Sequence, residues 1–411
     1  MIKSHLRPVR NVLRHGAARL LRNIADKADP AFSTVKLDVV SCIDECPICP
    51  NGGLTLVPLP GHEELAGQIK AKITKGSISR QFKPTPVNIV NPSFGSHDNE
   101  EPFLKLGKDK IGGYDCMVLA SGPGTYKMIM QLLIILWYLV GRDARRITVI
   151  FGYCPLSRSD KDEGNLILAL APIIVYLIAA ICGEKLSKII SADLHSSQLV
   201  LSAKPGKVTE IQMMRRVATT LLMDAKKAGK RLTIGFPDDS AAKRFENIIK
   251  TVCKEHKLDM PVIVAYKRRS GSSKTDITYI IGDVNRIKGS VVATFDDEAA
   301  TVGSNLGLAE TLTRTPKDDE GRKDKQKVYY EASAVWAAVI HGVLCGPAID
   351  RLSNPTKSVE RLYITDTIPV HNRPELQPLI DNGTIRVIEW MDDIAWAIYM
   401  HHWNRNIRGV R

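Results

Sequence analysis

The chain contains 411 residues, 44% of them hydrophobic and 25% charged, a composition typical of a globular protein with room for two domains. A formal net charge of +13 favours a phosphorylated or polyanionic partner. The sequence contains no helix-turn-helix, zinc-finger or RNA-binding motif, and 6% aromatic residues are too few for base stacking, so we expect no nucleic-acid partner. Eight scattered cysteines without a secretory signal predict reduced thiols and a cytoplasmic location.

The N-terminal extension, residues 1–53, differs from the rest of the chain. Residues 1–29 carry seven Lys and Arg against two Asp. Six apolar residues are spaced to line one face of a helix: Leu6, Val9, Leu13, Leu20, Leu21 and Ile24. A basic amphipathic start is typical of an organelle transit peptide, a surface helix or an arm that docks on a partner. Because serines are few, we favour the surface helix or the arm over organelle import.

Three cysteines follow, Cys42, Cys46 and Cys49. Their C-x3-C-x2-C spacing can hold a metal through three thiolates, and it also occurs in radical enzymes with an iron–sulfur cluster. The stretch is rich in Pro and Gly, and no fourth ligand is evident nearby. We therefore expect a loop with free thiols.

From Leu54 onward, strand-like and helix-like runs alternate, which predicts α/β architecture with a parallel sheet. The strand-like runs are residues 116–120, 147–151, 188–191, 232–236, 262–265, 278–281, 290–295 and 362–365. Helical segments lie between them, for example residues 128–140 and 240–256. Two comparable α/β domains joined near residue 200, residues 54–200 and 201–411, account for this pattern.

Two segments interrupt the pattern. Residues 166–182 form 17 consecutive positions without a charge, at the lower limit for a membrane span. Because Pro172 lies within this run and strands flank it, we expect a fully buried crossover helix, at a subunit contact, and no membrane partner. Residues 315–327 contain no apolar side chain and predict a solvated loop.

The segment 290–304 combines a buried strand with a polar turn. Asp296 and Asp297 follow the strand, and paired carboxylates suit vicinal hydroxyls. The turn Thr301–Ser304 precedes a helix expected at residues 305–312, and a turn before a helix N-terminus favours an anion. Together these features predict a sugar-phosphate site, although taken alone an acidic helix cap explains them equally well.

Four other strand ends also carry polar clusters: residues 152–162, 193–195, 237–239 and 266–269. Ligands of parallel sheets bind beyond the carboxyl ends of the strands. Carboxylates at these ends would hold Mg²⁺ together with phosphate oxygens. Lys and Arg would neutralise charge on a phosphoryl group in transfer.

In combination and order, these motifs resemble the ribose-phosphate diphosphokinases, also called phosphoribosyl pyrophosphate synthetases. The resemblance extends from about Leu54 to the C-terminus. It rests on residues 152–162, 193–198, 237–244, 267–269, 281–284, 296–304, 341–348 and 365–369.

The resemblance implies two tandem type I phosphoribosyltransferase-like domains, each a mainly parallel sheet flanked by helices. It also implies transfer of the diphosphoryl group of ATP to the 1-hydroxyl of ribose 5-phosphate, giving phosphoribosyl pyrophosphate and AMP. Mg²⁺ would be the cofactor. A homo-oligomer, either a hexamer or a multiple of dimers, would be the assembly.

The same resemblance assigns roles by position. The catalytic cations that stabilise the phosphoryl group would be Lys267 and Arg269. The ATP site would include Asn99, Glu101, Arg158, Ser159 and Asp160, the first two reaching a neighbouring subunit. The metal–triphosphate would be served by His195 and Asp238. The ribose hydroxyls would contact Asp296 and Asp297, and the 5-phosphate would contact Thr301, Gly303 and Ser304.

The chain departs from the family pattern at several positions. Ala300 stands where relatives usually have an Asp, Ser159 replaces a Gln, and His97 replaces a Phe. These departures keep open an alternative, a non-catalytic synthetase-like subunit that forms a hetero-oligomer with an active synthetase and regulates it. Retention of the other acidic and basic site residues favours the enzyme.

Overall fold

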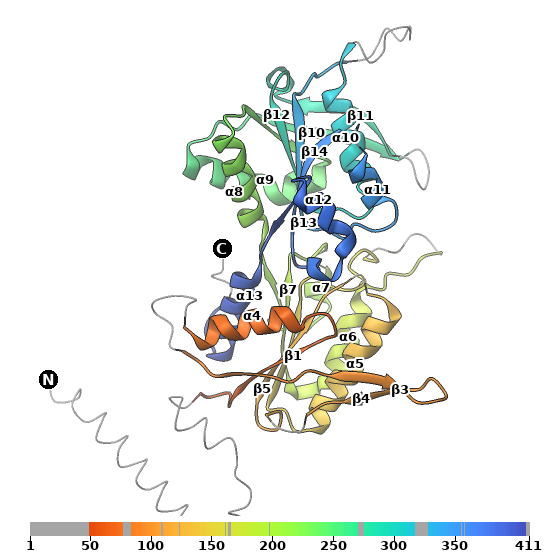
Figure 1. Ribbon diagram of the computed structural model, residues 1–411, viewed down its shortest axis with the longest axis vertical. Helices are drawn as coiled ribbons and strands as arrows, with labels where there is room; N and C mark the ends of the chain where they lie inside the picture. The colour runs from red at the N-terminus through yellow and green to blue at the C-terminus, as the bar shows by residue number, and fades with distance from the viewer. Residues whose placement is uncertain are drawn as a thin grey trace, which may run out of the picture.

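The computed structural model describes residues 49–76, 84–107, 110–122, 124–160, 162, 166–196, 198–269, 275–316, 328–354, 356 and 358–407. The basic segment 1–29, Cys42 and Cys46 lie outside the described residues, as does most of the expected loop 315–327. Two lobes follow one another along the long axis of the molecule (Figure 1).

The first lobe is built on a six-stranded sheet in the order β2-β1-β5-β6-β7-β8, in which every neighbouring pair is parallel. Its strands are β1 (Leu54–Pro58), β2 (Val87–Ile89), β5 (Asp115–Ala120), β6 (Arg146–Phe151), β7 (Leu186–Ala192) and β8 (Val208–Ile211). Its helices are α4 (Glu63–Thr74), α5 (Tyr126–Gly141), α6 (Ala171–Cys182) and the short α7 (Gln198–Leu201). A separate antiparallel hairpin joins β3 (Ser93–Ser96) to β4 (Pro102–Lys105).

The second lobe is built on a seven-stranded sheet in the order β11-β10-β9-β12-β13-β14-β15. Its strands are β9 (Leu232–Phe236), β10 (Val262–Arg269), β11 (Thr275–Gly282), β12 (Val291–Glu298), β13 (Ala334–His341), β14 (Val359–Thr365) and β15 (Ile385–Ile388). Its helices are α8 (Met214–Lys227), α9 (Asp239–His256), α10 (Gly303–Thr313), α11 (Ala348–Ser353) and α12 (Gln377–Asp381). Only the β10–β11 pair of this sheet is antiparallel. The expected α/β class with mainly parallel sheets is confirmed.

Three short 3-10 turns lie beside the second sheet and one beside the first, in the part of the chain that is described. They are η1 (Gly183–Lys185), η2 (Val284–Arg286), η4 (Val370–Asn372) and η5 (Pro374–Leu376).

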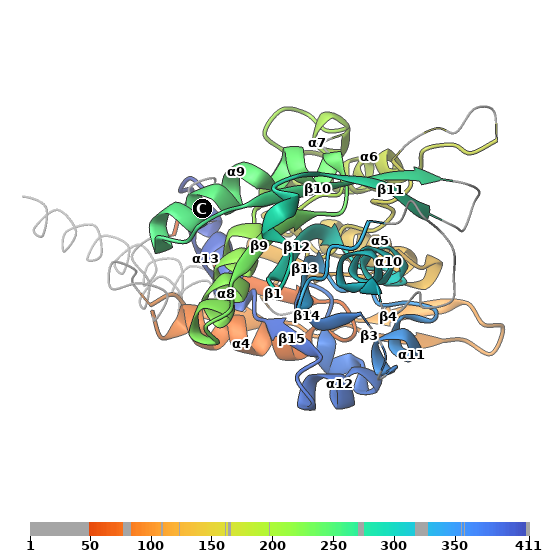
Figure 2. The same ribbon diagram turned by 90° about the horizontal axis from the view of Figure 1, so that it is seen from above.

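Helices cover both faces of the sheets, so the strands are buried on both sides and consist of nearly continuous apolar runs. Strands β5 and β13 are buried at every position. Figure 2 shows α4, α8, α9 and α13 (Met391–His402) on one side of the sheets and α5 and α10 on the other. One buried apolar cluster includes side chains of both sheets, α4, α8, α9 and α13, and therefore runs through both lobes.

Two elements cross the expected boundary near residue 200. Strand β8 pairs with β7 in the first sheet, and the C-terminal helix α13 packs against α4 (Figure 1). The division into residues 54–200 and 201–411 remains a proposal, and it has to accommodate both elements.

The lobes also meet at Gly152, at the end of β6. A Cβ atom at this position would lie 1.9 Å from the carbonyl oxygen of Thr367, so the close approach admits only glycine. Beside it, the hydroxyl of Ser121 donates a hydrogen bond to the same carbonyl oxygen and accepts one from the N–H of Tyr153. These contacts bring the carboxyl end of β6 against the second lobe.

The expectation of a fully buried crossover helix at residues 166–182 was wrong in one respect. Helix α6 does connect β6 to β7, but only one face of it is buried. Ile173 and Tyr176 are 45% and 60% exposed, and Trp137 on the neighbouring α5 is 70% exposed. No helix within the described ranges is long and apolar enough to cross a membrane.

Candidate active site

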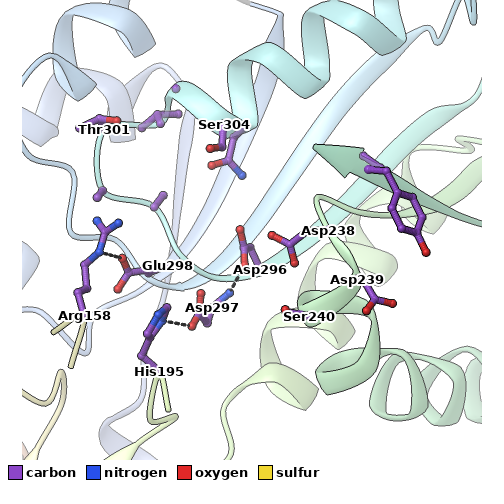
Figure 3. A pocket seen from close by; sticks show the side chains of 17 residues that line it. Arg158, His195, Asp238, Asp239, Ser240, Asp296, Asp297, Glu298, Thr301 and Ser304 are labelled. Carbon is purple, nitrogen blue, oxygen red and sulfur yellow. Dashed lines mark hydrogen bonds and ion pairs between the residues drawn. The ribbon is translucent and has the colours of Figure 1, made fainter. Parts of the chain in front are cut away.

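A cavity of about 550 Å³ lies at the carboxyl ends of β10 and β12, where the two lobes meet (Figure 3). This is the end at which parallel sheets bind ligands. Its lining comes from five segments of the chain: Arg158, His195, Asp238–Ser240, Ala265–Tyr266 and Asp296–Asn305.

The longest part of the lining is the loop from β12 into α10. Val302 precedes the helix with φ of 61°, a left-handed conformation that is uncommon for a β-branched residue. Its side chain has no oxygen to cap the helix, so the first N–H groups of α10 receive no side-chain cap there. Arg351 holds the turn from outside, because its Nη1 donates to the carbonyl oxygen of Thr301 at 2.8 Å. An uncapped helix N-terminus facing a cavity is suited to a phosphate group.

His195 and Asp297 form a pair across the boundary between the lobes. The Nδ1 atom of His195 lies 2.6 Å from Oδ2 of Asp297. The hydrogen bond to Asp297 raises the pKa of His195. Burial opposes ionisation of Asp297, but His195 and Arg244 outweigh it and hold the pKa of this carboxyl below its usual range. The pair is therefore most stable as imidazolium and carboxylate.

Arg244 connects this pair to deeper acids. Its Nη1 lies 3.3 Å from Asp297, and its Nη2 lies 3.2 Å from Glu210 and 3.6 Å from Asp193. Asp193 is fully buried, and burial raises its pKa to about 7. Such a carboxyl is neutral much more often than an exposed one.

His341 lies beneath the pair at the end of β13. Its Nδ1 lies 2.9 Å from the hydroxyl of Thr367, and its Nε2 lies 2.9 Å from the carbonyl oxygen of Asp193. Burial lowers its pKa to about 4, so the ring is neutral near pH 7. The neutral imidazole of His341 therefore connects Thr367 to Asp193 and holds the buried region next to His195 in place.

Glu298 links the lobes at a second point. Its Oε1 lies 3.1 Å from Nε of Arg158, and its Oε2 accepts a hydrogen bond from the hydroxyl of Tyr153 at 3.0 Å. Arg158 and Tyr153 both follow β6 in the first lobe, whereas Glu298 ends β12 in the second. The Arg158 guanidinium is thereby held at the cavity (Figure 3).

Comparison with known proteins shows which sequences the chain resembles. No family model matches the chain. Curated proteins named ribose-phosphate pyrophosphokinase match most of its length. The one from Rhodopirellula baltica is 27% identical over 74% of this chain and 85% of its own. The one from Streptomyces avermitilis is 27% identical over 80% and 91%, and ribose-phosphate pyrophosphokinase 2 from Schizosaccharomyces pombe is 28% identical over 68% and 78%.

The fold agrees with these matches. The crystal structure of phosphoribosylpyrophosphate synthetase from Mycobacterium smegmatis superposes with a TM-score of 0.65 at 21% identity, covering 86% of this chain and 99% of that one. Over most of its length the chain is thus similar to proteins named ribose-phosphate pyrophosphokinase. The expected fold, α/β with mainly parallel sheets in two lobes, is shared with this structure.

Most of the site residues expected from the pyrophosphokinase resemblance reach the cavity. Those that line it are Arg158, His195, Asp238, Asp296, Asp297, Thr301, Gly303 and Ser304. Lys267 and Arg269 end β10, directly after the lining residues Ala265 and Tyr266.

Four of the expected ATP-site residues do not line the cavity. The hydroxyl of Ser159 accepts a hydrogen bond from the N–H of Leu170, and Asp160 is buried. Asn99 and Glu101 lie in the turn of the β3–β4 hairpin, where the Asn99 side chain accepts a hydrogen bond from the N–H of Glu101. Both residues are exposed, and neither is among the residues that line the cavity.

Reasoning from the sequence missed Glu298, Tyr153, Arg244 and His341 as parts of this network. Glu298 adjoins the predicted pair Asp296 and Asp297, so its position was an available signal. No sequence signal pointed to Tyr153 as its partner, because 145 residues separate the two.

The donor atoms fit Mg²⁺ that is shared with a nucleotide. Asp238, Asp239 and Asp296 present carboxylates around the cavity, and oxygen ligands are what Mg²⁺ prefers (Figure 3). One oxygen of Asp238 also caps α9 by accepting from the N–H of Ala241. Within the described ranges no group of three or more His, Cys, Asp and Glu forms a ready metal site. Mg²⁺ commonly binds through one or two carboxylates with water and substrate phosphates.

Proposed function

We propose that the protein is a ribose-phosphate diphosphokinase that makes phosphoribosyl pyrophosphate and AMP from ATP and ribose 5-phosphate. The observation that carries the proposal is the shared cavity, to which the first lobe contributes Arg158 and His195 and the second contributes the loop 296–305. A two-substrate transfer needs both substrates held in one orientation, and a site between two lobes meets that need.

Ribose 5-phosphate would bind on the second lobe. Asp296 and Asp297 would accept hydrogen bonds from the 2- and 3-hydroxyls. The 5-phosphate would lie at the N-terminus of α10, among Thr301, Gly303 and Ser304. Support comes from the missing side-chain cap at Val302 and from Arg351, which holds the turn.

ATP would bind between the lobes with its phosphates near Arg158, while Asn99 and Glu101 would contact the adenine of a neighbouring subunit. Mg²⁺ would be held by Asp238 together with the nucleotide phosphates, and it would supply charge neutralisation. His195 would orient its remaining ring nitrogen, Nε2, toward a phosphate oxygen, because Nδ1 is engaged by Asp297. Ser159 and Asp160 would support the ATP loop from behind.

Lys267 and Arg269, at the end of β10 in the antiparallel β10–β11 pair, would add two cations to the site. The 1-hydroxyl of ribose attacks the β-phosphorus in line with the departing AMP. The two cations would stabilise the charge on the phosphoryl oxygens during transfer. Positioning and charge neutralisation, more than a strong base, would supply the rate enhancement.

A second candidate is the non-catalytic subunit, and one observation favours it. Ala300 lines the cavity where relatives have an acid, so one charged contact to the sugar-phosphate loop is missing. Loss of a charged contact at a phosphate site can cost about 2–4 kcal/mol in the transition state. Glu298, two residues earlier, keeps a third carboxylate at the cavity and supports the enzyme.

Release of AMP separates the two candidates. The purified full chain is mixed with ATP, Mg²⁺ and ribose 5-phosphate, and AMP is measured with Lys267→Ala as the matched control. We expect AMP formation that depends on ribose 5-phosphate and that falls by at least about 100-fold in the variant. ATP binding without turnover would contradict the proposed enzyme activity and favour the non-catalytic regulatory subunit.

We also propose a cytoplasmic homo-oligomer, with pairing to a related active synthetase and organelle import as the alternatives. Exposed apolar side chains gather on α5, on α6 and on the segment before α6. They are Tyr126, Met130, Trp137, Leu166, Ile167, Leu168, Leu170, Ile173 and Tyr176. Helices α5 and α6 contact each other, so the patch is continuous across them. Contiguous exposed apolar patches often mark protein–protein interaction sites.

A further inference from the structure

A second cluster of reactive side chains lies at the opposite end of the first sheet, where β5 and β6 begin. The Sγ atom of Cys49 lies 2.9 Å from Nε2 of His402. On the other side of the same ring, Nδ1 lies 2.9 Å from Oδ2 of Asp115. A thiol, an imidazole and a carboxylate in this order form the arrangement that activates nucleophilic cysteines.

The imidazole and the carboxylate are rigidly held. The side chains of His402 and Asp115 are only 1% and 0% exposed. Arg146 donates two hydrogen bonds to Asp115, at 2.9 and 2.7 Å. Burial opposes ionisation of Asp115, but His402 and Arg146 outweigh it and hold its pKa below the usual range. Asp115 is therefore a carboxylate, and it fixes the ring of His402 so that Nε2 faces Cys49.

His402 also lies at a favourable position, the end of a helix. His402 is the last residue of α13, and the C-terminus of a helix stabilises a positive charge. Its carbonyl oxygen accepts a hydrogen bond from the Asn51 side chain at 2.5 Å. The turn that carries Cys49 closes by a hydrogen bond from the N–H of Gly52 to the Cys49 carbonyl oxygen. The thiol is thereby held against the ring while remaining partly exposed.

We propose that Cys49 is an activated thiol, kept as a thiolate by His402 and Asp115, and that it is a modification site for small disulfides. The proton of the thiol passes to Nε2 of His402. The Cys49 sulfur then attacks one sulfur of a disulfide such as oxidised glutathione, a new S–S bond forms, and the old one breaks. The departing thiolate takes the proton from His402, so Cys49 is oxidised while the other half of the disulfide is reduced.

The titratable and charged groups around the cluster come from three elements besides the Cys49 turn. They are Asp115 on β5, Arg146 on β6 and His401 on α13. Burial lowers the pKa of His401 to about 4, so this neighbour is neutral near pH 7. Arg146 is engaged by Asp115 and by the His401 carbonyl oxygen. The contact between Cys49 and His402 is thus the one on which the proposed reactivity depends.

Alkylation kinetics test the proposal on the folded full chain. Cys42→Ser and Cys46→Ser are introduced together, so that only Cys49 is labelled in the N-terminal region. Iodoacetamide labelling of Cys49 and of the exposed Cys345 is followed by peptide mass spectrometry across pH, and each rate is normalised to its own alkaline plateau. Normalisation removes differences in accessibility. Near pH 6 we expect the fraction of the plateau rate that Cys49 retains to be at least about tenfold larger than the fraction that Cys345 retains.

A variant and a second probe complete the design. His402→Gln should shift the pH profile of Cys49 to that of Cys345, provided that circular dichroism shows a folded protein. Oxidised glutathione should add once, at Cys49, faster than at Cys345. The proposal is overturned if Cys49 and Cys345 of the parent protein show the same normalised pH profile. It is also overturned if Cys345 forms the mixed disulfide before Cys49. Neither of these measurements requires the His402→Gln variant to fold.

Discussion

Glu298 shows how a single side chain at the cavity can serve two lobes. One carboxylate oxygen contacts Arg158 and the other contacts Tyr153, so the second lobe is tied to the first at the cavity. Burial raises the pKa of Glu298, whereas Arg158 acts in the opposite direction. The carboxylate form is the one that orients the guanidinium.

We expect Glu298→Gln to weaken ATP binding selectively. The amide keeps an acceptor for Tyr153 but loses the charge that orients Arg158. The Arg158 side chain is 62% exposed, so we expect a modest increase in KM for ATP. The increase should be about fivefold, or ~1 kcal/mol, with little change in kcat. Steady-state kinetics measure this, with Glu331→Gln as control because Glu331 pairs with Lys288 outside the cavity lining. An unchanged KM for ATP would contradict the proposal that Glu298 orients Arg158 for nucleotide binding.

His341 predicts a pH dependence of stability. Its pKa falls from 6.5 in the unfolded chain to about 4 in the folded one. The unfolded state therefore binds the proton first, and stability is lost as the pH falls from about 6.5 to 4, by about 3 kcal/mol in total. Relative to His341→Asn, the parent protein should lose that much unfolding free energy in urea titrations across this range. Parallel curves for the two proteins would contradict it.

At the scale of elements, the C-terminal helix does the most to join distant parts of the chain. Helix α13 packs on α4, and its buried face includes Ile394 and Ile398. The facing side of α4 buries Leu65 and Ile69. Both helices belong to the apolar cluster that runs through the two lobes, so damage to α13 should destabilise both.

We expect Ile398→Ala to lower the free energy of unfolding by about 3 kcal/mol, because it leaves a cavity in a closely packed core. Asp392→Asn on the same helix is the matched control. Its ion pair with Lys72 is partly exposed, so the change should stay within about 0.5 kcal/mol. Urea unfolding followed by circular dichroism measures both. Equal losses would show that the packing of α13 is unimportant.

At the scale of the whole molecule, the α5–α6 patch is the feature that a single chain leaves unexplained. Its side chains are large, apolar and exposed. An interface between copies would bury them. The exposed hairpin turn with Asn99 and Glu101 is also consistent with a neighbouring subunit.

We expect Trp137→Glu to dissociate the proposed homo-oligomer, because it would place a charge within the exposed apolar patch. Gln68→Glu adds the same charge to the exposed face of α4 and should leave the mass unchanged. Sedimentation equilibrium gives the mass of each. An oligomer that survives Trp137→Glu would place the interface on another surface.

The sequence by itself determined the α/β class, eight of the strands, and the local motifs at the strand ends. Those features follow from apolar periodicity and from turns that involve neighbouring residues. Eight of the expected site residues meet in one cavity for the same reason, since the ends of parallel strands share one edge. Only the tertiary structure decided that Glu298 joins Arg158, that Cys49 meets His402, and that α6 exposes one face. Those contacts link residues far apart in the chain, and their energy depends on distances that no local pattern encodes.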